Sequence, residues 1–192
     1  MKKKILGLLL MTGSVVSSRA QKGTVLVYGV GGIHKEKGPN DDRTTVFTIS
    51  PGVGYQFTGN WAAGIAGSYG RQNFKPETGA ENRTNTYKLG GFTRYTHTFN
   101  TIFSLYGQGD VYCQSGKTQE IRSNGWGISI VPTVGINVSN GFALNVSFGG
   151  ISYETSKVKH ADHGTETFDL NFGQQVGIGI SKNFGRKDKG LE

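Results

Sequence analysis

The sequence predicts an all-β protein, an eight-stranded antiparallel up-and-down transmembrane β-barrel. Three observations lead to this prediction. Apolar and small polar residues alternate in eight stretches, charged residues are nearly absent from these stretches, and the connections between them alternate between short and long. The predicted strands are 24–33, 46–57, 61–70, 86–96, 102–113, 126–138, 142–153 and 168–181.

The sixth stretch shows the alternation most clearly. One parity carries Trp126, Ile128, Ile130, Pro132, Val134, Ile136 and Val138, and the other carries Gly127, Ser129, Val131, Thr133, Gly135 and Asn137. Because successive strand residues point to opposite faces, this stretch has one apolar and one small polar face. Residues 46–57 repeat the pattern. The first stretch is interrupted by glycines and gives no clear assignment of its faces.

The charged residues indicate that the apolar face meets lipid. Within the eight stretches only Lys88, Arg94, Asp110 and Asp169 are charged. A soluble barrel would need charged side chains such as Lys and Glu on its outer face. The polar face here consists instead of Gly, Ala, Ser, Thr and Asn, which suit the narrow interior of an eight-stranded barrel.

The connections alternate in length. Three are tight, with Gly and Asn for positive-φ positions, and lie at 58–60, 97–101 and 139–141. Four are long and charged, at 34–45, 71–85, 114–125 and 154–167. In outer-membrane barrels the short turns are periplasmic and the long loops extracellular, so we expect the same orientation here.

Residues 1–20 have the pattern of a cleaved signal peptide. Lys2, Lys3 and Lys4 precede an apolar stretch, and Ser18-Arg19-Ala20 offers a small-x-small cleavage site. The apolar stretch is too short to cross a ~30 Å hydrocarbon core as a helical anchor. We therefore expect export, a barrel over 21–184, a tail over 185–192 and a location in the outer membrane.

The overall charge excludes some functions. The net charge is +8, and removal of three lysines and one arginine with the signal peptide leaves about +4. No basic stripe interleaved with aromatic residues appears, so we expect no nucleic-acid partner. Cys113 is the single cysteine, which excludes an intramolecular disulfide.

Three segments resemble the small outer-membrane β-barrel family that includes the OmpA membrane domain and OmpX-like proteins. They are Ile49-Ser50-Pro51-Gly52-Val53-Gly54-Tyr55, Gly91-Phe92-Thr93-Arg94-Tyr95 and Gly177-Ile178-Gly179-Ile180-Ser181-Lys182-Asn183-Phe184. The resemblance covers nearly all of 21–184. It implies that Phe184 is the aromatic assembly signal read by the barrel-assembly machinery, although the 185–192 tail departs from the family pattern. It also implies outer-membrane lipids as partners in a Gram-negative envelope, with an extracellular partner of unknown identity.

A polar network is predicted inside the lumen. Arg94 and Asp110 lie on consecutive strands at lumen parity and are expected to form a buried pair, because a charge in a narrow lumen needs a partner. Lys88 and Asp169 extend this network, and Phe92, Tyr106 and Gln108 share its parity. A structural plug is the favoured interpretation, and a gate or proton path is the alternative.

Other candidate motifs do not amount to a catalytic, cofactor or metal site. His160, Asp162 and His163 supply three potential metal ligands in one loop, but no fourth ligand is visible. Ser115-Gly116-Lys117-Thr118 lacks the first glycine of a phosphate loop, Gly29-Val30-Gly31-Gly32-Ile33-His34 lacks the last glycine of a dinucleotide fingerprint, and His34 has no nucleophile beside it. We expect no enzyme activity, no cofactor and no metal.

The predicted function is therefore that of a porin-like barrel with a side-chain-filled lumen. It would act through surface loops in adhesion, envelope integrity or partner binding, an expectation that rests on family analogy. A narrow channel and a lipid-modifying barrel enzyme are the alternatives. A soluble ligand-binding barrel is a more distant one.

Overall fold

The computed structural model describes residues 23–38, 42–76, 78, 80–119, 121–159 and 163–185. The predicted signal peptide, His160, Asp162 and the tail after Gly185 lie outside the described residues. The described part of the chain contains no helix long and apolar enough to cross a membrane.

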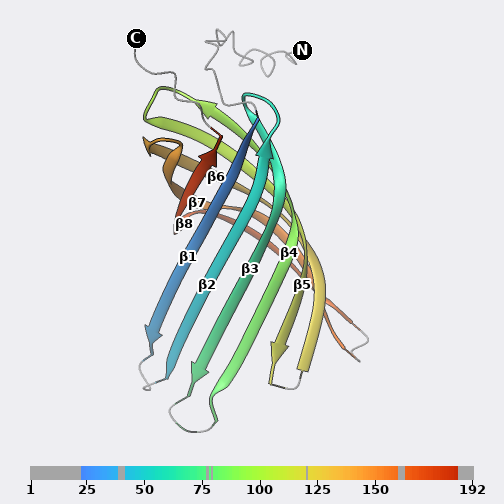
Figure 1. Cartoon of the computed structure of the whole chain (residues 1–192). Helices are drawn as coiled ribbons and strands as arrows, with labels where there is room; N and C mark the ends of the chain where they lie inside the picture. The colour runs from blue at the N-terminus through green and yellow to red at the C-terminus, as the bar shows by residue number, and fades with distance from the viewer. Residues whose placement is uncertain are drawn as a thin grey trace, which may run out of the picture.

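Eight antiparallel strands follow one another around a closed barrel, and β8 returns to pair with β1 (Figure 1). The strands are β1 Thr24–Lys37, β2 Arg43–Gln56, β3 Trp61–Lys75, β4 Asn82–Thr98, β5 Phe103–Thr118, β6 Ile121–Ser139, β7 Phe142–Val158 and β8 Thr165–Phe184. The predicted fold class is confirmed. All eight predicted strands are present in the predicted order.

The predicted long loops are wrong in extent. Most of 34–45, 71–85, 114–125 and 154–167 continues the strands, which leaves short connections at 38–42, 76–81, 119–120 and 159–164. The reason is that apolar alternation ends where the lipid-facing surface ends, whereas backbone pairing continues beyond it. The strand extensions carry polar and charged side chains, which resemble loop residues in composition.

The two ends of the barrel differ in their connections. We call the end with 57–60, 99–102 and 140–141 the turn end, and the opposite end the tip end. Asn140 and Gly141 both have positive φ, 46° and 75°, as a two-residue type I′ hairpin requires. The Thr58 hydroxyl accepts backbone N–H bonds from Asn60 and Trp61, which closes another tight turn. The predicted tight turns are confirmed.

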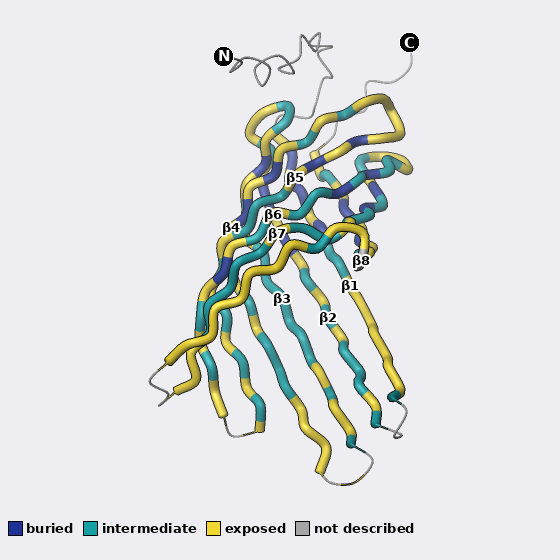
Figure 2. Tube along the Cα trace, turned by 180° about the vertical axis from the view of Figure 1, so that it is seen from behind, coloured by how far each residue is buried: buried dark blue, intermediate teal, exposed yellow. Residues whose placement is uncertain are grey.

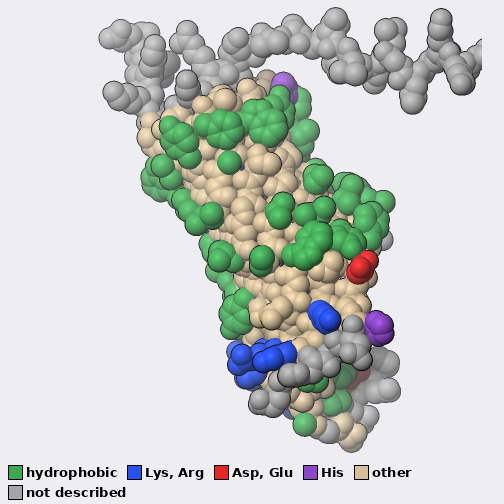
Figure 3. All heavy atoms as spheres, turned by 90° about the vertical axis from the view of Figure 1, so that its right-hand side faces the viewer, with side chains coloured by type: hydrophobic (Ala, Val, Ile, Leu, Met, Phe, Trp, Pro, Cys, Tyr) green, Lys and Arg blue, Asp and Glu red, His purple; other side chains and the backbone are tan. Residues whose placement is uncertain are grey.

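The apolar faces point outward. Phe47, Ile49, Val53 and Tyr55 of β2 are 40–52% exposed, and the opposite parity lines the lumen. β1 now has assigned faces, because Leu26 and Tyr28 are buried inside whereas Val25 and Val27 are exposed. Buried residues gather toward the turn end (Figure 2). In Figure 3, hydrophobic side chains are spread over the turn end and the middle of the visible face, and Lys and Arg side chains appear toward the tip end.

The seam between the first and last strands is shorter than the other ladders. β1 pairs with β8 over Val25–Gly31 and Ile178–Phe184. Beyond it, Gly32–Lys37 continues to pair with β2, and Thr165–Phe172 continues to pair with β7. Residues 31–37 of β1 are exposed on both faces. The barrel wall is thus continuous in its turn half and incomplete at this seam in its tip half.

A bulge in β7 reverses which residues face the lumen. Gly149 has a φ of +80° and interrupts the register with both β6 and β8. Phe148 faces outward before the bulge, and Ile151 faces outward after it. Since one extra residue inverts the alternation, Glu154 comes to lie on the inward face.

Candidate functional site

The centre of the lumen is occupied by the Arg94 side chain, which is 5% exposed. β4 directs it inward between two tyrosines, with its guanidinium carbon 4.6 Å from the Tyr28 ring centroid and 4.1 Å from that of Tyr106. Its Nε and Nη2 donate to Gln108 Oε1 at 3.0 and 2.6 Å. The cation is therefore held by aromatic faces and by a neutral amide.

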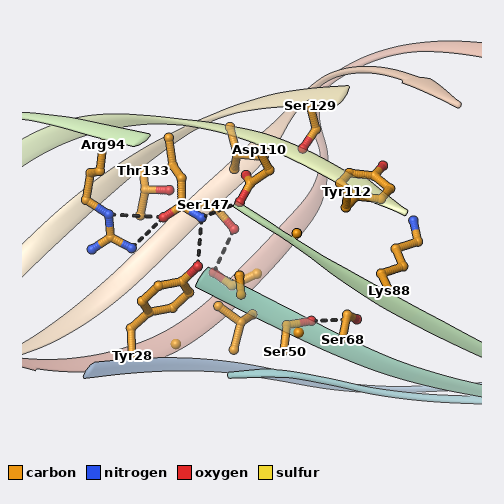
Figure 4. Close-up of a pocket in the computed structure, with 18 of the residues that line it drawn as sticks. Tyr28, Ser50, Ser68, Lys88, Arg94, Asp110, Tyr112, Ser129, Thr133 and Ser147 are labelled. Carbon is orange, nitrogen blue, oxygen red and sulfur yellow. Dashed lines mark hydrogen bonds between the residues drawn. The ribbon is translucent and has the colours of Figure 1, made fainter. Parts of the chain in front are cut away.

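Gln108 links Arg94 to Asp110, and this arrangement differs from the predicted direct pair. The Gln108 Nε2 donates to Asp110 Oδ1 and to the Tyr28 hydroxyl oxygen, each at 2.9 Å. The register explains the difference, because Arg94 lies opposite Gln108 and Asp110 lies opposite Phe92, two residues further along β5. Figure 4 shows Tyr28, Arg94 and Asp110 converging from different strands. We call Tyr28, Arg94, Gln108 and Asp110 the central layer.

Glycines on neighbouring strands make room for the aromatic rings of the lumen, because a glycine has no side chain. A Cβ on Gly52 would overlap the Tyr28 ring, and a Cβ on Gly127 would lie 2.8 Å from the Tyr112 ring. Tyr28 packs edge-on against Phe92 with 5.3 Å between ring centroids. These glycines therefore allow large side chains to fill a narrow barrel.

A second polar cluster lies nearer the tip end. Lys88 Nζ donates to Glu154 Oε1 at 2.6 Å, and the Tyr112 hydroxyl donates to the same oxygen at 2.6 Å. Lys88 also lies 4.7 Å from the Tyr112 ring centroid. The side chains of this cluster are partly accessible, since 30% of the Lys88 side chain and 28% of the Glu154 side chain are exposed. We call Lys88, Tyr112 and Glu154 the upper layer, where upper means nearer the tip end, which is drawn at the bottom of Figure 1.

Two cavities lie along the lumen, and the upper layer stands between them. The first has a volume of about 350 Å³ and runs from Arg94 and Tyr106 to Lys88 and Tyr112. The second has a volume of about 480 Å³, includes Lys88 and Glu154 in its lining, and extends past Gln72 and Thr118 toward the tip end. The central layer thus crosses the turn half of the lumen and the upper layer crosses it further out.

The four predicted network residues are not all brought together. Arg94 and Asp110 share the central layer, and Lys88 joins Glu154 in the upper layer. Asp169 is exposed on β8 opposite Ser152, where the seam is unpaired, and it does not belong to either layer. Its inward parity is therefore insufficient to bury it.

The remaining sequence candidates lie apart from the lumen. Phe184 ends β8, pairs with Val25 and is 49% exposed on the outer surface. His34 is exposed and lies 3.8 Å from Glu36, and His163 is exposed near the tip end. Within the described residues, no three His, Cys, Asp or Glu side chains are grouped to hold a metal.

Sequence reasoning missed Tyr28, Tyr112 and Glu154 as members of the layers. The glycine-broken pattern of β1 hid the orientation of Tyr28, and Glu154 looked like the first residue of a loop. One signal was present for Glu154. Phe148 and Ile151 are both apolar but three residues apart, with two glycines between them, which is typical of a bulge that shifts the alternation.

Comparison with known proteins identifies a family and a fold. The model of the family described as autotransporter beta-domain matches residues 25–176. No curated protein matches the chain.

Several solved structures of membrane barrels are similar to the chain. Pseudomonas aeruginosa OprG, an outer membrane protein, has a TM-score of 0.52 and 10% identity, with 86% of this chain and 97% of OprG covered. The N-terminal β-barrel domain of Pseudomonas aeruginosa OprF has a TM-score of 0.39 and 14% identity, over 85% and 98%. The translocator domain of the Neisseria meningitidis autotransporter NalP has a TM-score of 0.41 and 17% identity, with 88% of this chain and 72% of the NalP chain covered. The similarity to OprG shows that the fold is that of an outer-membrane β-barrel.

Proposed function

Because the chain belongs to the autotransporter beta-domain family, we propose that it resides in the outer membrane as a barrel that neither conducts nor catalyses. It acts through the surface at its tip end, in adhesion, envelope integrity or binding of an extracellular partner. The family and the fold support the membrane location. The role of the protein in the membrane is argued from its lumen and its surface.

The crossing of the lumen by the central layer carries this proposal. Arg94 is nearly fully buried, and two rings and an amide surround its guanidinium. Moving it aside would strand a cation and the Asp110 carboxylate in a region of low dielectric constant, which is costly. The layer is therefore better suited to a permanent plug than to a gate that opens repeatedly.

The tip end is the remaining surface on which the barrel can act. Its strands continue past the apolar band and expose polar and charged side chains on both faces. With the orientation typical of such barrels, these extensions project from the cell and the tight turns face the periplasm. They take the place of the long loops expected from the sequence.

Planar-bilayer recording tests the closed lumen. We expect no stable conductance from the wild-type protein, and intermittent conductance after Arg94→Gly, because the longest side chain of the central layer is then lost. Lys182→Gln, on the outer surface, should remain silent as the control. A reproducible wild-type channel that Arg94 or Asp110 substitutions close would contradict the plug and support the gate.

Surface labelling tests the orientation. In a Cys113→Ser background, a cysteine at Lys37 should react with a membrane-impermeant maleimide on intact cells, whereas one at Asn140 should react only after lysis. The reverse pattern would place the tip end in the periplasm.

A further inference from the structure

The outward face of the barrel carries its cations at one end. In the tip halves of β1 to β7, the Lys and Arg residues other than Lys88 all share the parity of the outward apolar residues on their strands. They are Lys35, Lys37, Arg43, Arg71, Lys75, Arg83, Lys117, Arg122 and Lys157. In the turn halves of the strands, Lys182 is the only described Lys or Arg with outward parity.

The described acidic residues of the tip half do not share this surface to the same extent. Glu36, Glu154 and Asp169 have inward parity, and Asp42 and Glu81 lie in the connections. On the outward face of the strands, Glu166 of β8 is the acidic residue that the structure describes. The tip part of the outward face of β1 to β7 is therefore a cationic belt.

The strand register brings members of this belt directly opposite one another. Lys117 of β5 lies opposite Arg122 of β6. Lys159 lies next to Arg122 as well, because its backbone N–H donates to the Arg122 carbonyl oxygen. Arg43 of β2 lies opposite Lys75 of β3. Like charges directly across a ladder destabilise it. An anion bound between them would remove this repulsion.

The position of the belt indicates which anion would bind. On each of several strands the cation follows the last large apolar or aromatic residue of the same face, as Lys35 follows Ile33 and Arg71 follows Tyr69. Tyr69 packs on Tyr87 at 5.2 Å between centroids, as expected of aromatic residues at a membrane interface. Side chains just beyond such aromatics reach the lipid headgroups. Figure 3 shows Lys and Arg side chains beyond the hydrophobic surface on one face.

We propose that this belt binds the phosphate groups of lipids in the leaflet at the tip end, with Lys117 and Arg122 as one site and Arg43 and Lys75 as another. Guanidinium groups bind phosphate oxygens in a bidentate manner, and ammonium groups add charge. Bound lipids would fix the barrel in its leaflet and link neighbouring headgroups. The inference rests on the proposed membrane location, and it adds the class of lipid that the barrel binds there, a lipid with a phosphate group.

Calorimetric titration of the purified protein in neutral detergent with micelles containing phosphatidic acid tests the inference. We expect binding that weakens as salt rises, with diacylglycerol of the same chains and inorganic phosphate alone both inactive. The double variant Lys117→Gln/Arg122→Gln should bind phosphatidic acid about 30-fold more weakly, since each surface cation contributes about a factor of five to anionic-lipid binding. Lys182→Gln, at the turn end, is the matched control and should bind like wild type.

Equal affinity for phosphatidic acid and diacylglycerol, or an unchanged affinity in the folded double variant, would overturn the inference. Folding of each variant is checked by its change in gel mobility on boiling. If that variant does not fold, Arg43→Gln/Lys75→Gln and the salt dependence of the wild-type protein decide the question. Wild-type protein that inserts into vesicles without conducting but ignores lipid phosphate refutes this inference alone. Wild-type protein that stays soluble without detergent refutes the proposed function as well.

Discussion

The turn half and the tip half of the same eight strands are built differently. In the turn half each strand is paired on both sides, and the lumen contains buried residues such as Leu26, Phe92 and Arg94. In the tip half the β1–β8 seam is unpaired, the lumen opens into a cavity of about 480 Å³, and cations occupy the outer face. The difference indicates that the turn half is the stable anchor and the tip half is the part available for interactions.

The largest expected effect comes from the central layer. Arg94→Ala should lower the free energy of unfolding by about 3–5 kcal/mol, because it leaves the Asp110 carboxylate and the Gln108 amide oxygen without their cation. Urea unfolding in detergent, followed by tryptophan fluorescence, measures the change. Lys182→Ala should change it by well under 1 kcal/mol, as expected of an exposed surface charge.

A double-mutant cycle then tests whether Arg94 and Asp110 act together through Gln108. Arg94→Met combined with Asp110→Asn should cost less than the sum of the two single changes, since neither charge is then left without its counterpart. Additive losses would mean that the central layer is not one interacting unit.

The next effect comes from the β7 bulge. Gly149→Ala should cost about 1–3 kcal/mol, because the residue has a φ of +80° and a Cβ there would overlap the Asn171 carbonyl oxygen. Gly29→Ala is the control, since a Cβ at Gly29 meets no atom within 4 Å. Equal unfolding midpoints for the two variants would show that the bulge is not required.

Loss of the upper layer should have a smaller effect than loss of the central layer. Lys88→Met should cost about 1 kcal/mol, because its ion pair with Glu154 is partly solvated. The same urea titration measures it. A loss as large as that of Arg94→Ala would place the boundary between anchor and interaction surface closer to the tip end than we propose.

The smallest effect is a difference in reactivity along one strand face. In a Cys113→Ser background, cysteines at Val111 and Lys117 of β5 share the outward face. In lipid vesicles the Lys117 position should react readily with a charged maleimide, whereas the Val111 position should react slowly because it faces hydrocarbon. Similar rates at both positions would mean that the apolar band does not end between them.

The outcome of the sequence predictions follows the same division. In the turn half, alternation such as that of Ile49, Val53 and Tyr55 predicted strands and faces correctly, because burial in lipid imposes period two. In the tip half the same criterion failed, since polar side chains on both faces carry no alternating signal although the backbone pairing continues. Asp169 was assigned by parity alone, and the unpaired seam leaves it exposed.

The central layer could be predicted only in part. The inward parity of Arg94 and Asp110 followed from the sequence, but their relative heights depend on a register that a tight turn does not fix. The roles of Gln108 as the link and of Tyr28 as its partner across the lumen can be recognised only in the closed barrel, because Tyr28 lies on β1, far from Gln108 in sequence.

Backbone hydrogen exchange, measured residue by residue in lipid nanodiscs, tests most directly whether the two halves differ. We expect amides of Leu26, Phe92 and Thr133 to exchange at least a hundredfold more slowly than those of Ile33, Arg83 and Ser123 on the same strands. Local opening of the tip half would then precede that of the turn half. Uniform protection along each strand, or faster exchange at the turn end, would contradict the division into anchor and interaction surface.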